Sequence, residues 1–183
     1  MRKLCVAVVT LILALCAIPS AVFAHEGHPH GVVFGGFSNL HPLIVHLPIT
    51  MLLVAPILQI LSVFQKGKLP QWTTLAFVLL GAVGAYLSGE VFHPDTTDLG
   101  DVANKILESH EQWADRSQIL SYIAVIPAAL ALFIARFEKH MKVIAFAVLL
   151  AAGACIVVAG HEGAKLVHIH GIGAEGNYIK DSK

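Results

Sequence analysis

Apolar residues fill four long stretches of the chain after residue 40, with shorter polar segments between them. The stretches cover about 43–64, 72–92, 119–137 and 143–160. A helix that crosses a membrane needs about 20 predominantly apolar residues, and each stretch is close to that length. The pattern therefore predicts an all-α chain with four membrane-spanning helices that pack as one bundle.

The pattern changes between the second and third stretches, where apolar and polar residues alternate with a helical period. Asp98 followed by Asp101 is typical of a helix start with an acidic first turn. The apolar positions recur at spacings of three and four residues and are Leu99, Val102, Ile106, His110 and Trp113. We expect a short periplasmic amphipathic helix here, with the His110 side chain directed at the bundle.

The first apolar segment has the features of a secretory signal peptide. Arg2 and Lys3 precede an apolar run over 4–18, which Pro19 and then Ala24 follow. A basic start, a short apolar run and a small residue at the cut predict cleavage after Ala24. An uncleaved membrane anchor is the alternative, and both Pro19 and the short run disfavour it.

This interpretation divides the chain into four segments. The signal peptide covers 1–24, and a His-rich periplasmic arm without helical period covers 25–39. The four-helix membrane domain covers 40–173, and a periplasmic tail covers 174–183.

The distribution of charge predicts the orientation in the membrane. The connection over 93–116 carries six acidic and two basic residues, as suits the periplasmic side. Lysine and arginine concentrate instead around the two short connections, at Lys66, Lys68, Arg136, Lys139 and Lys142. The positive-inside rule assigns such connections to the cytoplasm. We therefore expect a multi-pass protein of the bacterial inner membrane with both termini in the periplasm.

The composition agrees with a membrane protein and narrows its partners. Hydrophobic residues make up 56% of the chain and charged residues 13%, with a mean hydropathy of +0.74, whereas soluble domains are about 25% charged. The formal net charge is zero, so the chain has no excess of positive charge that would favour binding of nucleic acid. The lipid bilayer is the expected surrounding. Cleavage would leave Cys155 as the one cysteine of the mature chain, without a disulfide partner.

Small residues repeat at four-residue spacing in two of the predicted spans. The second span contains Gly81, Ala85 and Gly89. In the fourth span the small-residue ridge is Ala147, Ala151, Cys155, Ala159 and Gly163. Such a ridge lets a helix or a flat ligand approach the backbone closely, and we favour ordinary helix packing.

The histidines are the candidate chemistry, because histidine is unfavourable in lipid and is usually kept there for a function. Only His140 falls on the cytoplasmic side. The predicted topology places the others in the periplasm or at the periplasmic ends of spans: His25, His28, His30, His41, His46, His93, His110, His161, His168 and His170. Imidazoles and carboxylates on facing helices are how bundles form metal and haem sites.

Three functions compete. The first is electron transfer by a b-type haem held between two imidazoles, with His46 and His110 as the expected ligands and His41 or His161 as substitutes. The second is binding or handling of copper or zinc, with ligands from His41, His46, Glu90, His93, His110, His161 and Glu162. The third is a structural subunit whose histidines only cap and pack.

Enzymatic catalysis is not expected, because no nucleophile–base pairing, phosphate-binding glycine loop or carboxylate couple occurs at recognisable spacing. Glu90 is the one acid within a predicted span. It either joins the histidines or reaches the membrane interface.

The predicted new N-terminus is a separate candidate metal site. His25 would present its α-amine beside its own imidazole, with His28 and His30 nearby. Amine and imidazole nitrogens suit Cu(II) best among common divalent ions. Binding of copper by the arm is one hypothesis, and an incidentally His-rich tail is the other.

Three short strings resemble a known bacterial family: HPLIVHLP at 41–48, GHEG at 160–163 and HGIG at 170–173. They are similar to the four-span membrane family catalogued as domain of unknown function family 2231, over about 40–173. Its members are often fused to, or encoded beside, c-type cytochrome domains. The resemblance implies redox work, with a c-type cytochrome or another redox membrane subunit as partner. The chain has no Cys-x-x-Cys-His string, so it attaches no c-type haem itself.

Overall fold

The structure is a computed structural model and describes residues 40–65, 67–93, 96 and 99–172. Within these residues the regular structure is helical throughout, without a β-strand. The elements are α2 (His41–Ile44), α3 (His46–Phe64), α4 (Leu69–Tyr86), the π-helical turn η2 (Leu87–Val91), α5 (Asp101–Phe133), the 3₁₀ turn η3 (Ala135–Phe137) and α6 (Glu138–His168).

Four of these helical segments are long and apolar enough to cross a membrane, so the prediction of four such helices is confirmed. They are His41–Phe64, Leu69–Val91, Asp101–Phe133 and Ala135–His168. Their outer faces carry large apolar side chains, such as Ile57 at 58% exposure and Ile126 at 61%. An apolar outer surface of this kind suits a multi-pass protein surrounded by lipid.

The predicted amphipathic helix and the predicted third span are one continuous helix. α5 has 33 residues, about 50 Å at the α-helical rise, which exceeds the hydrocarbon core of about 30 Å. No glycine or proline lies between Trp113 and Ile119 to end a helix. The amphipathic segment is therefore the first part of a spanning helix.

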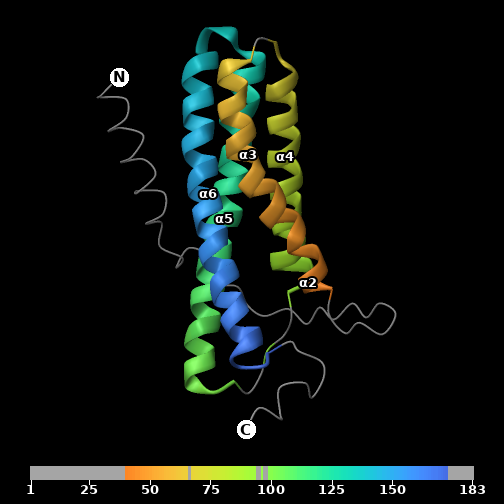
Figure 1. Cartoon of the computed structure of the whole chain (residues 1–183), viewed down its shortest axis with the longest axis vertical. Helices are drawn as coiled ribbons and strands as arrows, with labels where there is room; N and C mark the ends of the chain where they lie inside the picture. Colours follow the sequence, from red (N-terminus) through yellow and green to blue (C-terminus); the bar gives the residue numbers. More distant parts are fainter. Residues whose placement is uncertain (1–39, 66, 94–95, 97–98, 173–183) are drawn as a thin grey trace, which may run out of the picture.

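The helices form two antiparallel pairs, α3 with α4 and α5 with α6 (Figure 1). α5 and α6 are the longer pair and extend past the other two at the lower end of the view. That end, which we call the histidine end, collects α2, η2, the start of α5 and the end of α6. The end of α3, the start of α4 and η3 lie together at the opposite end, which we call the connection end.

Close approach of helices depends on small residues. A Cβ added at Gly81 would lie 2.7 Å from Leu52 Cδ2, and one added at Gly84 would lie 2.8 Å from Pro48 Cδ. These glycines let α4 approach α3 closely.

α5 and α6 meet along two rows of residues with seven-residue spacing. Ser117 Oγ donates a hydrogen bond to Ala152 O at 3.0 Å, which fixes the register of the two rows. The row on α5 is Ala103, His110, Ser117, Ala124 and Ala131, and the row on α6 is Ala145, Ala152, Ala159 and Leu166. A seven-residue repeat keeps two helices in contact over many turns.

The expected apolar stripe of α5 is only partly correct. Val102 is 66% exposed, and the buried residue of that turn is Ala103. Ala103 precedes His110 by seven residues and so lies on nearly the same helix face. The seven-residue row with small side chains is therefore the contact face, although Val102 is more apolar.

The connection end is held by a buried lysine. Lys142 is 8% exposed, and its Nζ donates to Ser62 O at 2.9 Å and pairs with Glu138 Oε1 at 2.8 Å. Its own carbonyl oxygen accepts from Gln59 Nε2 at 3.2 Å. Ser62 O belongs to the last turn of α3, where carbonyls lack a partner within the helix, so Lys142 acts as a C-terminal cap for a neighbouring helix.

A second lysine repeats this arrangement between the other two helices. Lys68 Nζ donates to Leu132 O at 3.0 Å, in the last turn of α5. Gln71 Nε2 donates to Glu138 Oε1 at 2.8 Å and so ties α4 to α6. Two of the basic residues that predict topology thus also hold helix ends together.

Replacement of Lys142 tests this cap. Lys142→Met removes the ammonium group and leaves Ser62 O buried without that donor, so we expect a loss of about 1–3 kcal/mol in unfolding free energy. Lys139→Met on the same turn is the matched control, because Lys139 is exposed. Thermal unfolding in detergent should show a lower midpoint for Lys142→Met only. Equal midpoints for the two variants would contradict the cap.

Candidate functional site

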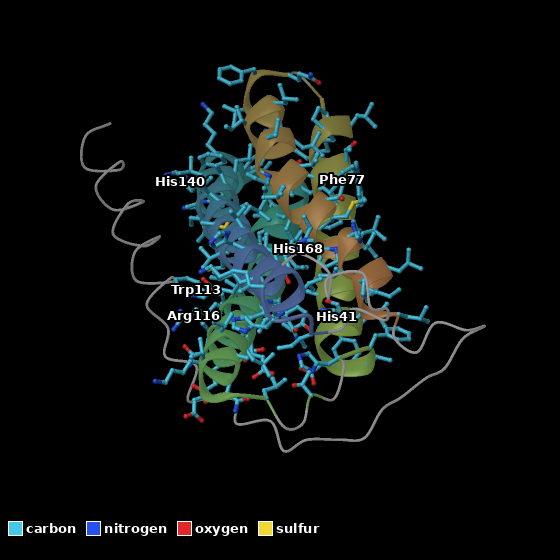
Figure 2. The ribbon with its side chains drawn as sticks, turned by 60° about the horizontal axis from the view of Figure 1, so that its bottom comes forward. His41, Phe77, Trp113, Arg116, His140 and His168 are labelled. Carbon is cyan, nitrogen blue, oxygen red and sulfur yellow. The ribbon has the colours of Figure 1, made fainter. Side chains whose placement is uncertain are left out.

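The described histidines gather toward the histidine end, with His140 as the exception. Figure 2 turns this end forward and shows His41 and His168 there, with His140 on the far part of α6. The other described members are His46, His93, His110, His161 and His170. The expected gathering of histidines from several elements at one end of the bundle is therefore present among the described residues.

His41 is fixed by the π-helical turn at the end of α4. The helix start at His41 is favoured by Pro42, whose missing N–H costs nothing in a first turn. His41 Nδ1 lies 2.9 Å from Ser88 O in η2. A carbonyl oxygen only accepts, so Nδ1 carries a proton. The backbone of Phe92 also hydrogen-bonds to this ring. π-Helical turns occur often at functional sites.

His110 is fixed in the same manner by α6. Its Nδ1 donates to Ala159 O at 2.8 Å, and its ring is half-buried. A Cβ added at Gly163 would lie 3.1 Å from His110 Cε1, so the ring rests where α6 has no side chain. The expectation that His110 points at the bundle is confirmed, and in the neutral ring the lone pair is on Nε2.

His93 completes the group of half-buried histidines. The His93 and His41 rings meet edge to face, with centroids 5.8 Å apart at 75°. His93 Nε2 also lies 3.8 Å from Glu111 Oε1 on α5. Both His93 and His110 interact electrostatically with His41. His41 and His93 are thus in ring contact, and His110 on α5 lies within electrostatic range of His41.

Other predicted ligands lie outside this group. His46 is exposed, and its Nδ1 bonds to Pro42 O one turn earlier in its own segment. His161 is exposed on α6, and Glu162 pairs with Lys165 at 2.9 Å. The expected pairing of His46 with His110 is therefore not favoured by the side-chain positions. His25, His28 and His30, with the predicted signal peptide, lie outside the described residues.

Glu90 is tied to α5 through Gln118, a residue that sequence reasoning missed. Gln118 Nε2 donates to Glu90 Oε1 at 3.4 Å, and a Cβ at Gly89 would lie 2.7 Å from Gln118 Oε1. Glu111 was missed as well. Both lie on α5, seven residues apart and so on nearly the same helix face.

The arrangement restricts which ligands the site can hold. In the part of the chain that the structure describes, no group of three or more His, Cys, Asp or Glu residues is placed to hold a metal ion. The expected metal site with three or four protein ligands is therefore not assembled there. A cavity of about 370 Å³ at this end is lined by the start of α5 with His170 and Ile172, and not by His41, His93 or His110. What the site offers is a pair of imidazoles with oriented nitrogens.

Comparison of the chain with protein-family models, with curated proteins and with solved structures gave no match.

Proposed function

We propose that this chain is an electron-transfer membrane protein that holds b-type haem between His41 and His110. The observation that carries the proposal is shared by both residues. Each is half-buried, comes from a different helix and donates Nδ1–H to a backbone carbonyl. Metal-binding histidines almost always fix their second nitrogen in this way, which sets the tautomer and directs Nε2 at the metal.

The ligand pair differs from the one that the sequence favours. His46 is exposed and bonded within its own segment, whereas His41 bonds across to η2 and interacts with His110. His41 therefore replaces His46 as the partner of His110 in the proposal.

The donor set fits a haem better than a metal ion held by protein alone. A haem iron takes four nitrogens from the porphyrin and needs only two axial ligands, which two neutral imidazoles supply. The absence of a three-residue ligand group among the described residues is no obstacle to this function. When bound, the haem would supply reversible one-electron redox chemistry. His41 and His110 would hold and orient it, and their surroundings would set its potential.

The electron partner follows from the resemblance to the four-span family. Its members are often associated with c-type cytochrome domains, so a c-type cytochrome or another redox membrane subunit is the proposed partner. The half-buried histidines lie at one end of the bundle, where a haem edge would be near the membrane surface.

Optical spectra of histidine variants test the haem proposal. Protein purified from haem-replete cells should show a Soret band and, after reduction, an α-band. His41→Ala and His110→Ala should each lose these bands, because each removes an axial ligand. His46→Ala and His161→Ala should keep them, because both side chains are exposed.

Two outcomes would overturn this proposal. A colourless wild-type protein from such cells would exclude haem binding. Loss of the bands in His46→Ala with retention in His41→Ala would restore the pair that the sequence favours.

A copper or zinc site is the second candidate, supported by the contact between His41 and His93. Their ring centroids are 5.8 Å apart, and imidazole is a common ligand of both metals. This site would need further ligands from solvent or from parts of the chain outside the described residues.

Elemental analysis separates the two candidates. The protein is purified without a His-tag or nickel column, as wild type and as His93→Ala. Iron near one equivalent per chain, unchanged in His93→Ala, supports haem. Copper or zinc that is lost in His93→Ala supports the second candidate, and neither metal in the wild type leaves a structural subunit.

We further propose the orientation in a bacterial inner membrane, with a cleaved signal peptide and both termini in the periplasm. The support is the basic character of the connection end, where Arg136 and Lys139 are exposed. The histidine end would then face the periplasm.

Reporter fusions after Lys183 test the orientation. Alkaline phosphatase fused there should be active, because that enzyme needs the periplasm, and green fluorescent protein exported by the same route should stay dark. A bright fluorescent fusion with inactive phosphatase would reverse the orientation and place the histidine end in the cytoplasm.

A further inference from the structure

His110 is the large residue in a row of small ones. The α5 row contains alanine or serine at its other four positions, and the facing α6 row is mainly alanine. An imidazole needs more room than these side chains, so α6 must make space for it. It does so at Gly163, one turn after Ala159, on the same face of the helix.

Gly163 faces the His110 ring. A Cβ added at Gly163 would meet His110 Cε1 at 3.1 Å and His110 Nδ1 at 3.2 Å, and apart from the backbone of α6 no other described residue comes within 4 Å. Contacts this short require the ring to give by a few tenths of an ångström. One of the two atoms is Nδ1, which donates to Ala159 O at 2.8 Å. A methyl group at this position would therefore push on the atom that anchors the ring.

We propose that Gly163 is the positioning residue of His110. By leaving its side of α6 bare, it lets Nδ1 reach Ala159 O, and this bond keeps the proton on Nδ1 and the lone pair on Nε2. Gly163 thus determines the tautomer and the direction of the ligand atom without touching a ligand itself. The inference rests on the proposed function in so far as His110 is an axial ligand; the positioning itself does not depend on haem.

Gly163→Ala is the test variant, and α6 supplies a matched control. Gly160 lies one turn earlier in the same helix, and a Cβ there would meet no atom of another described element within 4 Å. Both substitutions add one methyl group and raise helix propensity equally. Only Gly163→Ala should affect His110, so a difference between the variants reports the contact with the ring.

The first measurement needs no haem. Nitrogen-15 NMR of histidine-labelled, haem-free protein in detergent distinguishes a protonated Nδ1 from a protonated Nε2, and His110→Ala identifies the His110 signals. We expect the Nδ1-protonated form in wild type and Gly160→Ala, and its loss in Gly163→Ala. Unchanged His110 signals in Gly163→Ala would overturn the proposal.

The second measurement uses haem. Loss of a partner that orients a metal-binding histidine weakens metal affinity by about 10–100-fold, so Gly163→Ala should bind haem that much more weakly than Gly160→Ala. Equal affinities would show that Gly163 does not position an axial ligand. If wild-type protein binds no haem but the NMR difference is present, the proposed function fails and the positioning stands.

A double variant covers the case in which Gly163→Ala folds poorly. Beyond the backbone of α6, His110 supplies the neighbours of the added Cβ among the described residues, so Gly163→Ala/His110→Ala should restore the unfolding midpoint to that of His110→Ala or above. If the double variant remains as unstable as Gly163→Ala, the added methyl group acts on something other than His110, and the proposal is wrong.

Discussion

The constraint on which this structure depends is that a polar group inside a membrane has no water to bond with. Each such group must find its partner in the protein or leave the hydrocarbon region. Within the four long helices the backbone groups bond to one another, and polar side chains and the carbonyls of the last turns still need partners. The structure pairs these with each other: Lys142 and Lys68 donate to last-turn carbonyls of α3 and α5. His41 and His110 likewise donate to backbone carbonyls.

The same device has different consequences at the two ends. At the connection end, the side chain of Lys142 has a single nitrogen, Nζ. This nitrogen bonds to Ser62 O and Glu138 and so holds helices together. At the histidine end, an imidazole has two nitrogens. At His110, Nδ1 bonds to Ala159 O, and the lone pair of the neutral ring is on Nε2. A lysine that bonds to a backbone carbonyl has no second nitrogen with which to bind a ligand, whereas a histidine does. This difference makes the histidine end the candidate site.

Much of the fold could be predicted from the sequence, because the lengths of the apolar runs and the periods within them are local properties. The four spans and the inward direction of His110 are of this kind. The continuity of α5 was missed, although the segment between Trp113 and Ile119 has no helix breaker. The polar residues of that segment suggested that the helix ends there. They show only where the helix leaves the membrane, because a helix can continue into water.

The candidate site could be predicted only in part, because its composition depends on contacts between distant segments. His41 and His46 are five residues apart and lie on different faces of the chain near the α2–α3 junction. Which of them turns inward depends on where Ser88 lies, 47 residues away, and no local pattern contains that information. Gln118 and Glu111 were missed for the same reason, since their partners Glu90 and His93 come from another part of the chain.

The small-residue ridge of α6 shows how one pattern can serve two functions. Ala151 and Cys155 are fully buried in the core, as ordinary helix packing predicts. Gly163 continues the same spacing, but its neighbour is the His110 ring and not an apolar side chain. Both cases depend on close approach: small residues on α6 let the side chains of α5 come near the α6 backbone. Where α5 presents alanine the result is a core, and where it presents histidine the result is a ring held against a carbonyl with its second nitrogen free.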